Sequence, residues 1–215
     1  MPGPSPNSIK TSALKSKILH VAQTSVYQVK VQPPSRVMSF LNSGTRNFNY
    51  SADGENVELM CSAASLPGAN LFTHEATNDF AGMSEKMAYR KDFGNTLDLT
   101  FMVNNRYDVI ELFDGWVDFI AGQSSDNGRY LNSAVNYRMN YPQTYRSNVY
   151  LTKFEKNATA ERRRSISDSY QLQYTFVDAF PISIAPTQVS YEASNVLKYN
   201  ISLSYTRYIR ERKYA

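Results

Sequence analysis

The sequence predicts a mainly β protein (β+α), an antiparallel β-sandwich or partly closed barrel with one flanking α-helix. Aromatic residues, which favour strands together with β-branched residues, are frequent: 16 Tyr and 11 Phe occur among 215 residues. Several segments alternate apolar and polar residues with a period of two, the pattern of a half-buried strand. One segment, 107–121, instead places its apolar residues at helical spacing. With 42% hydrophobic residues, the chain can bury a substantial core.

Residues 1–25 are predicted to be flexible or ordered only by a partner, because the opening is rich in Pro, Ser and Lys and has no period. Residues 26–215 are expected to form a single domain. The first predicted strand, VYQVKV, is ended by Pro33 and Pro34, since proline cannot donate to a strand ladder. One face of this strand carries Tyr27, Val29 and Val31.

The stretch 35–54 is rich in Asn, Ser and Gly and is expected to be a loop or a hairpin. The following run, VELMCSAA, alternates and is predicted to be a strand that ends at a Leu-Pro-Gly turn. Its faces would carry Val57, Leu59, Cys61 and Ala63 on one side and Glu58, Met60 and Ser62 on the other. The single cysteine excludes an intramolecular disulfide, and its place in this run favours a small buried apolar residue over a reactive thiol.

The polar segment 69–94 is longer than compact domains usually tolerate as a plain connection. It also carries large apolar residues, which a loose surface loop would leave in water. We therefore expect an extended arm or hairpin that becomes ordered against a neighbouring subunit.

The clearest period of two lies in LDLTFMV, at 97–103, and this predicted strand leads directly into the helix 107–121. The apolar stripe of the helix consists of Val109, Leu112, Phe113, Trp116, Phe119 and Ile120. Asn104 or Asn105 is expected to cap its start, and Gly122 lies just past its end. The opposite, acidic face is either a solvated surface or a docking surface.

Beyond this helix, residues 124–147 are predicted to be rich in loops, and SNVYLTKFE to be a strand. The charged run 161–164 (ERRR) is either a solvated hairpin tip or a contact to an acidic surface. The segment 174–208 is expected to form a strand, a Phe-Pro turn, a second strand, a Ser-Asn turn and a last long strand, Val196 to Tyr208.

The sequence offers no pattern for catalysis. His20 and His74 each lack a second ligand at metal-binding spacing, and P-loop, dinucleotide-binding and nucleophile-elbow motifs are absent. We expect no enzyme activity, no metal and no cofactor. No run approaches the roughly 18 apolar residues of a membrane span, so we expect a protein made in a cytoplasm without a membrane anchor.

A nucleic-acid-binding module is the alternative from a different functional class. The formal net charge of +4 is compatible with nucleic acid but does not require it. Basic and aromatic residues interleave in SYTRYIRERKY, at 204–214, as they do in platforms that stack single-stranded bases. A monomeric DNA-binding β-domain therefore remains a candidate.

Three blocks carry a family resemblance: VELMCSAASLPG, NTLDLTFMVNNRYDVIELFDGWVDFIAG and VDAFPISIAPTQVSYEASNVLKYNISLSYTRY. Their order and spacing over residues 26–208 resemble the tail tube protein of contractile-tailed, T4-like bacteriophages, including tube proteins of phages that infect cyanobacteria. They also resemble baseplate proteins that share the tube fold and initiate tube polymerisation, which is the alternative within the same machine.

The resemblance implies a structural virion protein of the phage tail. Six subunits would form a ring, and rings would stack into a hollow tube, inside a contractile sheath, that conducts DNA during injection. The implied partners are further copies of the chain, the sheath, baseplate and tail terminator proteins, and DNA in transient, non-specific contact. Assembly would take place in the host cytoplasm.

Three sets of residues gain expected roles from this resemblance. Contacts to the adjacent ring are expected from Phe72, Phe80, Met83 and Met87. The surface facing the sheath is expected to include Asp108, Glu111, Asp114 and Asp118. The candidates for lining the lumen are Asp98, Thr100, Asn200, Ser202 and Ser204, because small polar side chains let DNA slide whereas arginines would hold its phosphates.

Overall fold

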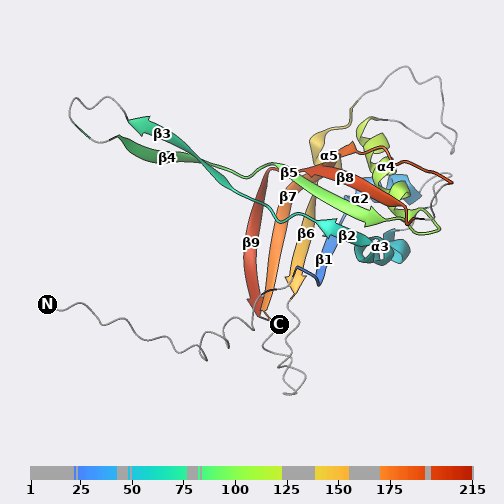
Figure 1. The fold of residues 1–215 in the computed structure, drawn as a ribbon. Helices are drawn as coiled ribbons and strands as arrows, with labels where there is room; N and C mark the ends of the chain where they lie inside the picture. The colour runs from blue at the N-terminus through green and yellow to red at the C-terminus, as the bar shows by residue number, and fades with distance from the viewer. Residues whose placement is uncertain are drawn as a thin grey trace, which may run out of the picture.

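A computed structural model describes residues 22, 24–42, 48, 50–76, 82, 84–122, 139–154, 170–191 and 195–214. Strands and helices follow one another along the chain as shown in Figure 1. They are β1 (Tyr27–Val31), α2 (Ser35–Asn42), α3 (Tyr50–Leu59), β2 (Cys61–Ala64), β3 (Asn70–Ala76), β4 (Glu85–Asp92), β5 (Thr96–Met102), α4 (Asp108–Ile120), α5 (Pro142–Tyr145), β6 (Ser147–Phe154), β7 (Tyr170–Ile184), β8 (Lys198–Ser204) and β9 (Arg207–Tyr214).

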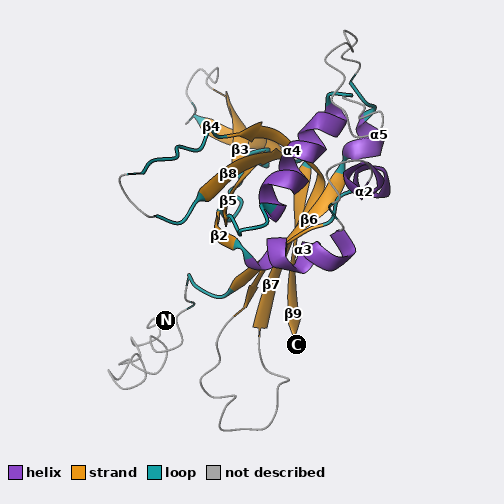
Figure 2. Ribbon diagram, turned by 90° about the vertical axis from the view of Figure 1, so that its right-hand side faces the viewer, coloured by secondary structure: helices purple, strands orange, loops and turns teal. Residues whose placement is uncertain are grey.

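Apart from β3 and β4, which pair only with each other, the strands form two antiparallel layers that share β7. The first half of β7 lies between β6 and β9, with β1 beyond β6, and its second half pairs with β8, which continues through β5 to β2. The described strands do not close into a barrel, because β1, β2 and β9 each pair on one side only. Figure 2 shows the helices gathered on one side of the strands. The predicted fold class, mainly antiparallel β with few helices, is confirmed.

Strand β7 contradicts the predicted Phe-Pro turn. Phe180 and Pro181 lie inside one continuous strand, and the pairing register with β8 shifts between Pro181 and Ser183. Asp178, just before, adopts a positive φ of 58°. Proline is tolerated in strands at such irregular positions, and a bulge bends the strand. The dipeptide therefore marks the point where β7 passes from one layer to the other.

The last predicted strand, Val196 to Tyr208, is in fact parts of two strands. β8 ends at Ser204 and β9 begins at Arg207, in the other layer. The break is held by backbone hydrogen bonds, since the Tyr205 N–H donates to the Asn95 carbonyl (3.1 Å) and the Thr206 N–H to the Val177 carbonyl (3.0 Å). Tyr205 and Thr206, the two residues between β8 and β9, are thus enough to direct the chain from one layer into the other.

The segment 35–59 is the third correction. It forms α2 and α3 rather than a loop, and α3 includes the first part of the predicted strand Val57–Ala63. Val57 is 2% exposed and Leu59 is 74% exposed, so these residues do not share a face. Helix α2 begins directly after two prolines, which are favoured at helix starts because their missing N–H groups would be unpaired there anyway. The expected single flanking helix is accordingly one of four described helices.

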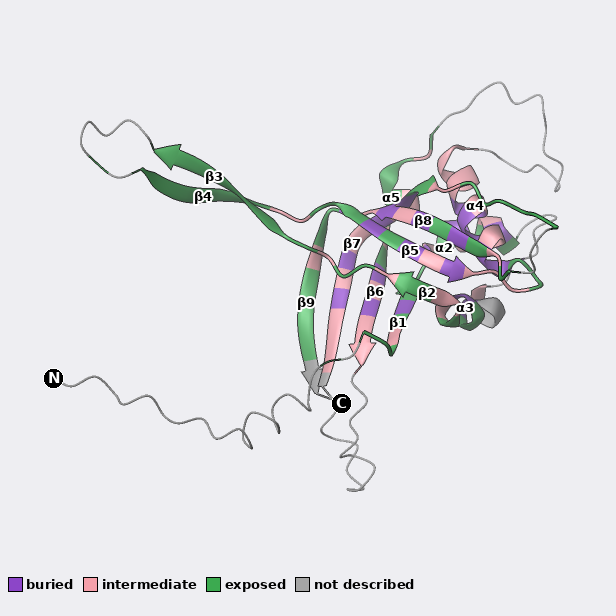
Figure 3. Ribbon diagram, in the orientation of Figure 1, coloured by how far each residue is buried: buried purple, intermediate pink, exposed green. Residues whose placement is uncertain are grey.

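Helix α4 packs on the core with the apolar stripe that the sequence predicts. Val109, Leu112, Phe113 and Trp116 are fully buried, and the Phe113 ring lies 5.4 Å from that of Phe101 on β5. The predicted faces of β1 and β5 are also buried, apart from the half-buried Tyr27, and Figure 3 shows this alternation along the strands.

The ends of α4 also follow the sequence prediction. The N-cap position is Tyr107, but the Asn104 side-chain oxygen accepts a hydrogen bond from the Asp108 N–H (3.0 Å), which satisfies a free donor of the first turn. Gly122 follows the helix with a φ of 73°, the left-handed conformation that favours glycine.

Candidate assembly surfaces

A small polar face covers the outer side of β5 and β8. Antiparallel pairing places Asp98 opposite Ser202 and Thr100 opposite Asn200, while Ser204 lies opposite Thr96. The Ser202 hydroxyl donates to the Asp98 carboxylate at 2.6 Å. The alternate residues of both strands point into the core and are buried. The structure therefore brings all five residues of the predicted lumen set together on one solvent-facing surface.

This small polar face carries little net charge. The only charged residues of β5 and β8 are Asp98 and Lys198, which have opposite signs. The face continues onto β2, where the Ser62 hydroxyl donates to the Thr100 carbonyl (3.1 Å). A surface of hydroxyls and amides with balanced charge cannot hold a phosphate backbone strongly.

Strands β3 and β4 pair with each other as a hairpin arm, as the sequence predicts, and the ordering of this arm against a neighbouring subunit stays a prediction. Every residue of β3 is exposed, as is every residue of β4 except Asp92. Figure 1 shows the arm projecting away from the rest of the molecule. An isolated two-stranded hairpin is marginally stable in water. An arm of this kind therefore needs another surface to keep it ordered.

Apolar side chains lie along the arm without a covering layer. The rings of Phe72 and Tyr89 stack at 6.3 Å, and Leu71 and Tyr89 are 63% and 69% exposed. Met87 is also exposed, so two of the predicted inter-ring residues, Phe72 and Met87, lie on the arm in contact with solvent. The other two, Phe80 and Met83, lie outside the described residues. The sequence does not indicate Leu71 and Tyr89, because a polar segment without a clear period shows no strand faces.

The base of the arm is fixed to the body by aromatic residues. The Lys91 ammonium lies 4.6 Å from the ring centroid of Phe93 and 5.2 Å from that of Tyr208, and these two rings meet edge to face at 5.4 Å. The Tyr205 hydroxyl donates to the Phe93 carbonyl (2.5 Å). Gly94, with a φ of 75°, lets the chain turn from the arm into β5.

The acidic residues of α4 only partly form the outward surface that the sequence suggested. Asp108 is 4% exposed, so its assignment to an outer face is wrong. Its carboxylate accepts a hydrogen bond from the Asn104 amide (2.6 Å), which compensates its burial. Asp114 is half-buried and accepts a hydrogen bond from the Tyr199 hydroxyl. Glu111 and Asp118 are half-buried as well, and their expected role toward the sheath stays a prediction.

A groove of about 640 Å³ opens between the free ends of the two layers. The sequence does not indicate this groove, since five strands distant in sequence contribute to it. Most of its lining is apolar, with two basic side chains. The lining residues are Ala22, Thr24, Tyr27, Ala64, Leu66, Leu151, Lys153, Gln171, Leu172 and Arg212.

Two tyrosine hydroxyls form hydrogen bonds that link β1 to neighbouring elements. One tyrosine lies on β1 beside the groove, and the other lies on α3. The Tyr27 hydroxyl donates to the Cys61 carbonyl (3.2 Å), and the Tyr50 hydroxyl donates to the Val31 carbonyl. Burial raises the pKa of each tyrosine to about 12. Burial also raises the pKa of the half-buried Cys61 to about 11, which keeps it a thiol near neutral pH and disfavours reactivity.

These pKa values predict alkaline destabilisation. Well below pH 10 the two tyrosines are protonated in both the folded and the unfolded chain. Above pH 10 the unfolded chain loses these protons, whereas the folded chain keeps them until about pH 12. The free energy of unfolding should therefore fall as the pH rises through this window. Denaturant unfolding between pH 8 and 12 should show a shallower fall for Tyr27→Phe/Tyr50→Phe than for the exposed control Tyr141→Phe. Equal slopes would contradict the assignment.

Among the described helices, none combines the length and apolar composition needed to cross a membrane. The described ranges also hold no group of three or more His, Cys, Asp or Glu side chains placed to bind a metal ion.

Comparisons with known proteins identified one matching family and several solved structures of low sequence identity. A model of the phage tail tube protein family matches residues 22–211. No curated protein matches the sequence.

Among solved structures, one similar chain comes from the sheath-tube complex of an extracellular contractile injection system in the extended state. Its sequence identity to this chain is 12% and the TM-score is 0.48. The match covers 92% of this chain and 96% of that chain. Another similar chain comes from the tube-terminating cap of the anti-feeding prophage, with 12% sequence identity and a TM-score of 0.49. The match covers 90% of this chain and 93% of that chain. A third is an Hcp protein, with 9% sequence identity and a TM-score of 0.40. The match covers 88% of this chain and 98% of that chain.

Proposed function

Because the chain belongs to the phage tail tube protein family, we propose that it is the subunit of the inner tube of a contractile tail, with six copies in each ring and rings stacked along the tube. The observation that carries this proposal is the hairpin arm, which exposes apolar side chains and has no covering layer of its own. A neighbouring subunit supplies that layer. Contacts between unlike surfaces close into a ring when the rotation between copies closes, and they extend as an open polymer when it does not, as proposed for the contacts of the arm along the axis.

The small polar face of β5 and β8 would line the lumen through which DNA passes. Its hydroxyl and amide groups form hydrogen bonds with water, and its few charges balance. DNA affinity arises mainly from cations that neutralise phosphates, so a wall of this composition lets DNA slide. The contact with DNA is transient and independent of sequence.

The remaining partners would meet the ends and the outside of the tube. Baseplate and tail terminator proteins contact the first and last rings, and the sheath surrounds the rings. On α4, the acidic candidates for the sheath surface are Glu111, Asp114 and Asp118, which are half-buried, whereas Asp108 is buried. The role is structural, without catalysis or a cofactor, in a virion tail assembled in the host cytoplasm.

Site-directed labelling tests the assignment of the lumen. In a Cys61→Ala background, a cysteine introduced by Thr100→Cys should react with a small maleimide in both dispersed subunits and assembled tubes. A maleimide attached to a polymer too large to enter the tube should react with dispersed subunits only. Glu111→Cys, on the helix assigned to the outer surface, is the matched control and should react with both reagents in tubes. Equal access of the large reagent to position 100 in tubes would contradict the assignment.

A further inference from the structure

We propose that residues 18–21 (ILHV), which lie outside the described residues, form a strap across the apolar groove of their own subunit. The strap continues the path of Thr24 and Ala22, which already line the groove. It closes the open end of the core with apolar side chains of the same chain. The contact lies within one subunit, so it does not depend on how subunits stack.

The groove exposes the end of the core. One row of residues across the strands is buried there: Val29, Leu151 and Tyr174. The next row outward lines the groove and consists of Tyr27 on β1, Lys153 on β6, Leu172 on β7 and Arg212 on β9. On the opposite side, β2 has only four residues and ends at Ala64, and Leu66 beyond it is 54% exposed. The core therefore lacks a cover at this end.

A left-handed turn at Val26 directs the chain between the groove and β1. Val26 has a φ of 66°, which a β-branched residue rarely adopts. The Lys153 ammonium donates to the carbonyls of Ser25 (2.7 Å) and Val26 (3.3 Å). It also donates to the Phe154 carbonyl (2.7 Å), and the Phe154 N–H donates to the Val26 carbonyl (3.1 Å). A strained residue persists only where surrounding contacts determine its conformation, so these bonds fix the direction of the chain.

The composition of the strap suits the groove. Ile18, Leu19 and Val21 are apolar, and residues 18–21 contain no Asp, Glu, Lys or Arg. The cations of the lining need no counter-ion from the strap, because Lys153 donates to three carbonyls and Arg212 also has an interaction partner. An uncharged segment can therefore cover both. Removal of apolar surface from water on both sides stabilises this contact.

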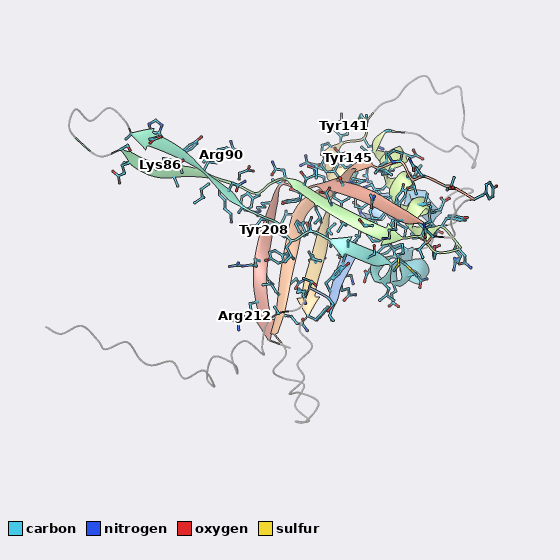
Figure 4. All side chains as sticks on the ribbon, in the orientation of Figure 1. Lys86, Arg90, Tyr141, Tyr145, Tyr208 and Arg212 are labelled. Carbon is cyan, nitrogen blue, oxygen red and sulfur yellow. The ribbon has the colours of Figure 1, made fainter. Side chains whose placement is uncertain are left out.

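The length and the attachment of the strap also fit. From β1 to β9 the groove row crosses three strand spacings, about 14 Å, and four extended residues span about 13 Å. Because the strap is joined to residues that line the groove, its effective concentration there exceeds that of a separate partner. The hairpin arm of the same chain cannot serve, since Figure 4 shows Arg212 and the labelled arm residues Lys86 and Arg90 far apart, with Tyr208 between them.

Cysteine labelling of dispersed subunits tests the strap. In a Cys61→Ala background, Leu172→Cys places a thiol in the groove lining. It should react with a small maleimide about tenfold more slowly in the full chain than in a chain that lacks residues 2–21, because labelling requires the strap to open. Thr175→Cys, on the opposite face of β7, is the matched control and should react equally fast in both chains.

A second variant keeps the full length of the chain. Ile18→Lys/Leu19→Lys should let the cysteine at position 172 react as fast as in the truncated chain, because the groove cannot bury two added charges. Ser12→Lys/Ala13→Lys adds the same charges outside the strap and should retain the protection.

The turn at Val26 has its own pair of variants. Val26→Pro imposes a φ near −65° and should abolish the protection, because the chain then leaves β1 in another direction. Val26→Asn should retain the protection, since asparagine tolerates the left-handed conformation.

Equal labelling of position 172 with and without residues 2–21 would overturn the strap. Protection that increases with protein concentration would assign the groove to a second copy of the chain and would overturn it as well. All these rates are measured on dispersed subunits, so their outcome is independent of whether the chain forms tubes.

Discussion

Shortening the hairpin arm should abolish tube formation and leave the subunit folded. Residues 71–91 can be replaced by Asn-Gly, because Asn70 and Asp92 lie opposite each other and this dipeptide forms two-residue hairpin turns. Within β3 and β4 the deletion removes no buried side chain, and it retains Phe93, whose carbonyl accepts a hydrogen bond from the Tyr205 hydroxyl. Pelleting assays and electron microscopy should detect no tubes at concentrations at which the full chain assembles. Circular dichroism and thermal unfolding should resemble those of the full-length subunit.

A second variant separates the length of the arm from its apolar surface. Replacing Leu71, Phe72, Met87 and Tyr89 by serine keeps the backbone of the arm and removes its large apolar side chains. We expect the same loss of assembly, because burial of such side chains provides most of the stabilisation at an interface. Normal tubes from the shortened chain would show that the arm does not stack the rings.

The largest effect on folding is expected for Trp116→Ala. Trp116 is 0% exposed, and its indole N–H donates to the Tyr145 carbonyl (3.0 Å), which connects α4 to the end of α5. The substitution leaves a large cavity and an unpaired carbonyl. Truncation of a buried Trp costs about 3–5 kcal/mol, a large part of the stability of a typical domain. Denaturant unfolding of dispersed subunits measures this loss.

Tyr141→Ala is the matched control for the truncation of an aromatic residue. Tyr141 is strongly exposed, close to the same α5 turn. Its removal should change the free energy of unfolding by about 0.5 kcal/mol or less, as is usual for surface positions. A similar loss for both variants would show that Trp116 does not hold the core together.

The elements predicted correctly are those whose pattern is long and local. In β5 and α4 the period changes from two to helical within a few residues, and the buried residues follow both periods. The prediction failed at 57–63 because a short alternating run spans the end of α3 and the start of β2. It failed at Pro181 because a local turn signal also fits a bulge, and the change of layer in β7 depends on strands distant in sequence.

The same distinction applies to the candidate surfaces. The small polar face could be predicted, because alternation decides which residues share a face and antiparallel pairing then places Asp98 beside Ser202. The burial of Asp108 could not be predicted, since it is compensated by hydrogen bonds exchanged with Asn104, which helical spacing does not show. The groove is lined by residues between Ala22 and Arg212 that are distant in sequence, so no local pattern indicates it.

Electron microscopy of the purified chain over a range of concentrations tests the central claim most directly. The proposed function predicts hollow tubes that lengthen above a threshold concentration, with six subunits in each ring. Single rings that never elongate would instead indicate a baseplate protein that initiates the tube. A chain that stays monomeric at every concentration and binds DNA with an affinity that falls steeply with salt would contradict the claim.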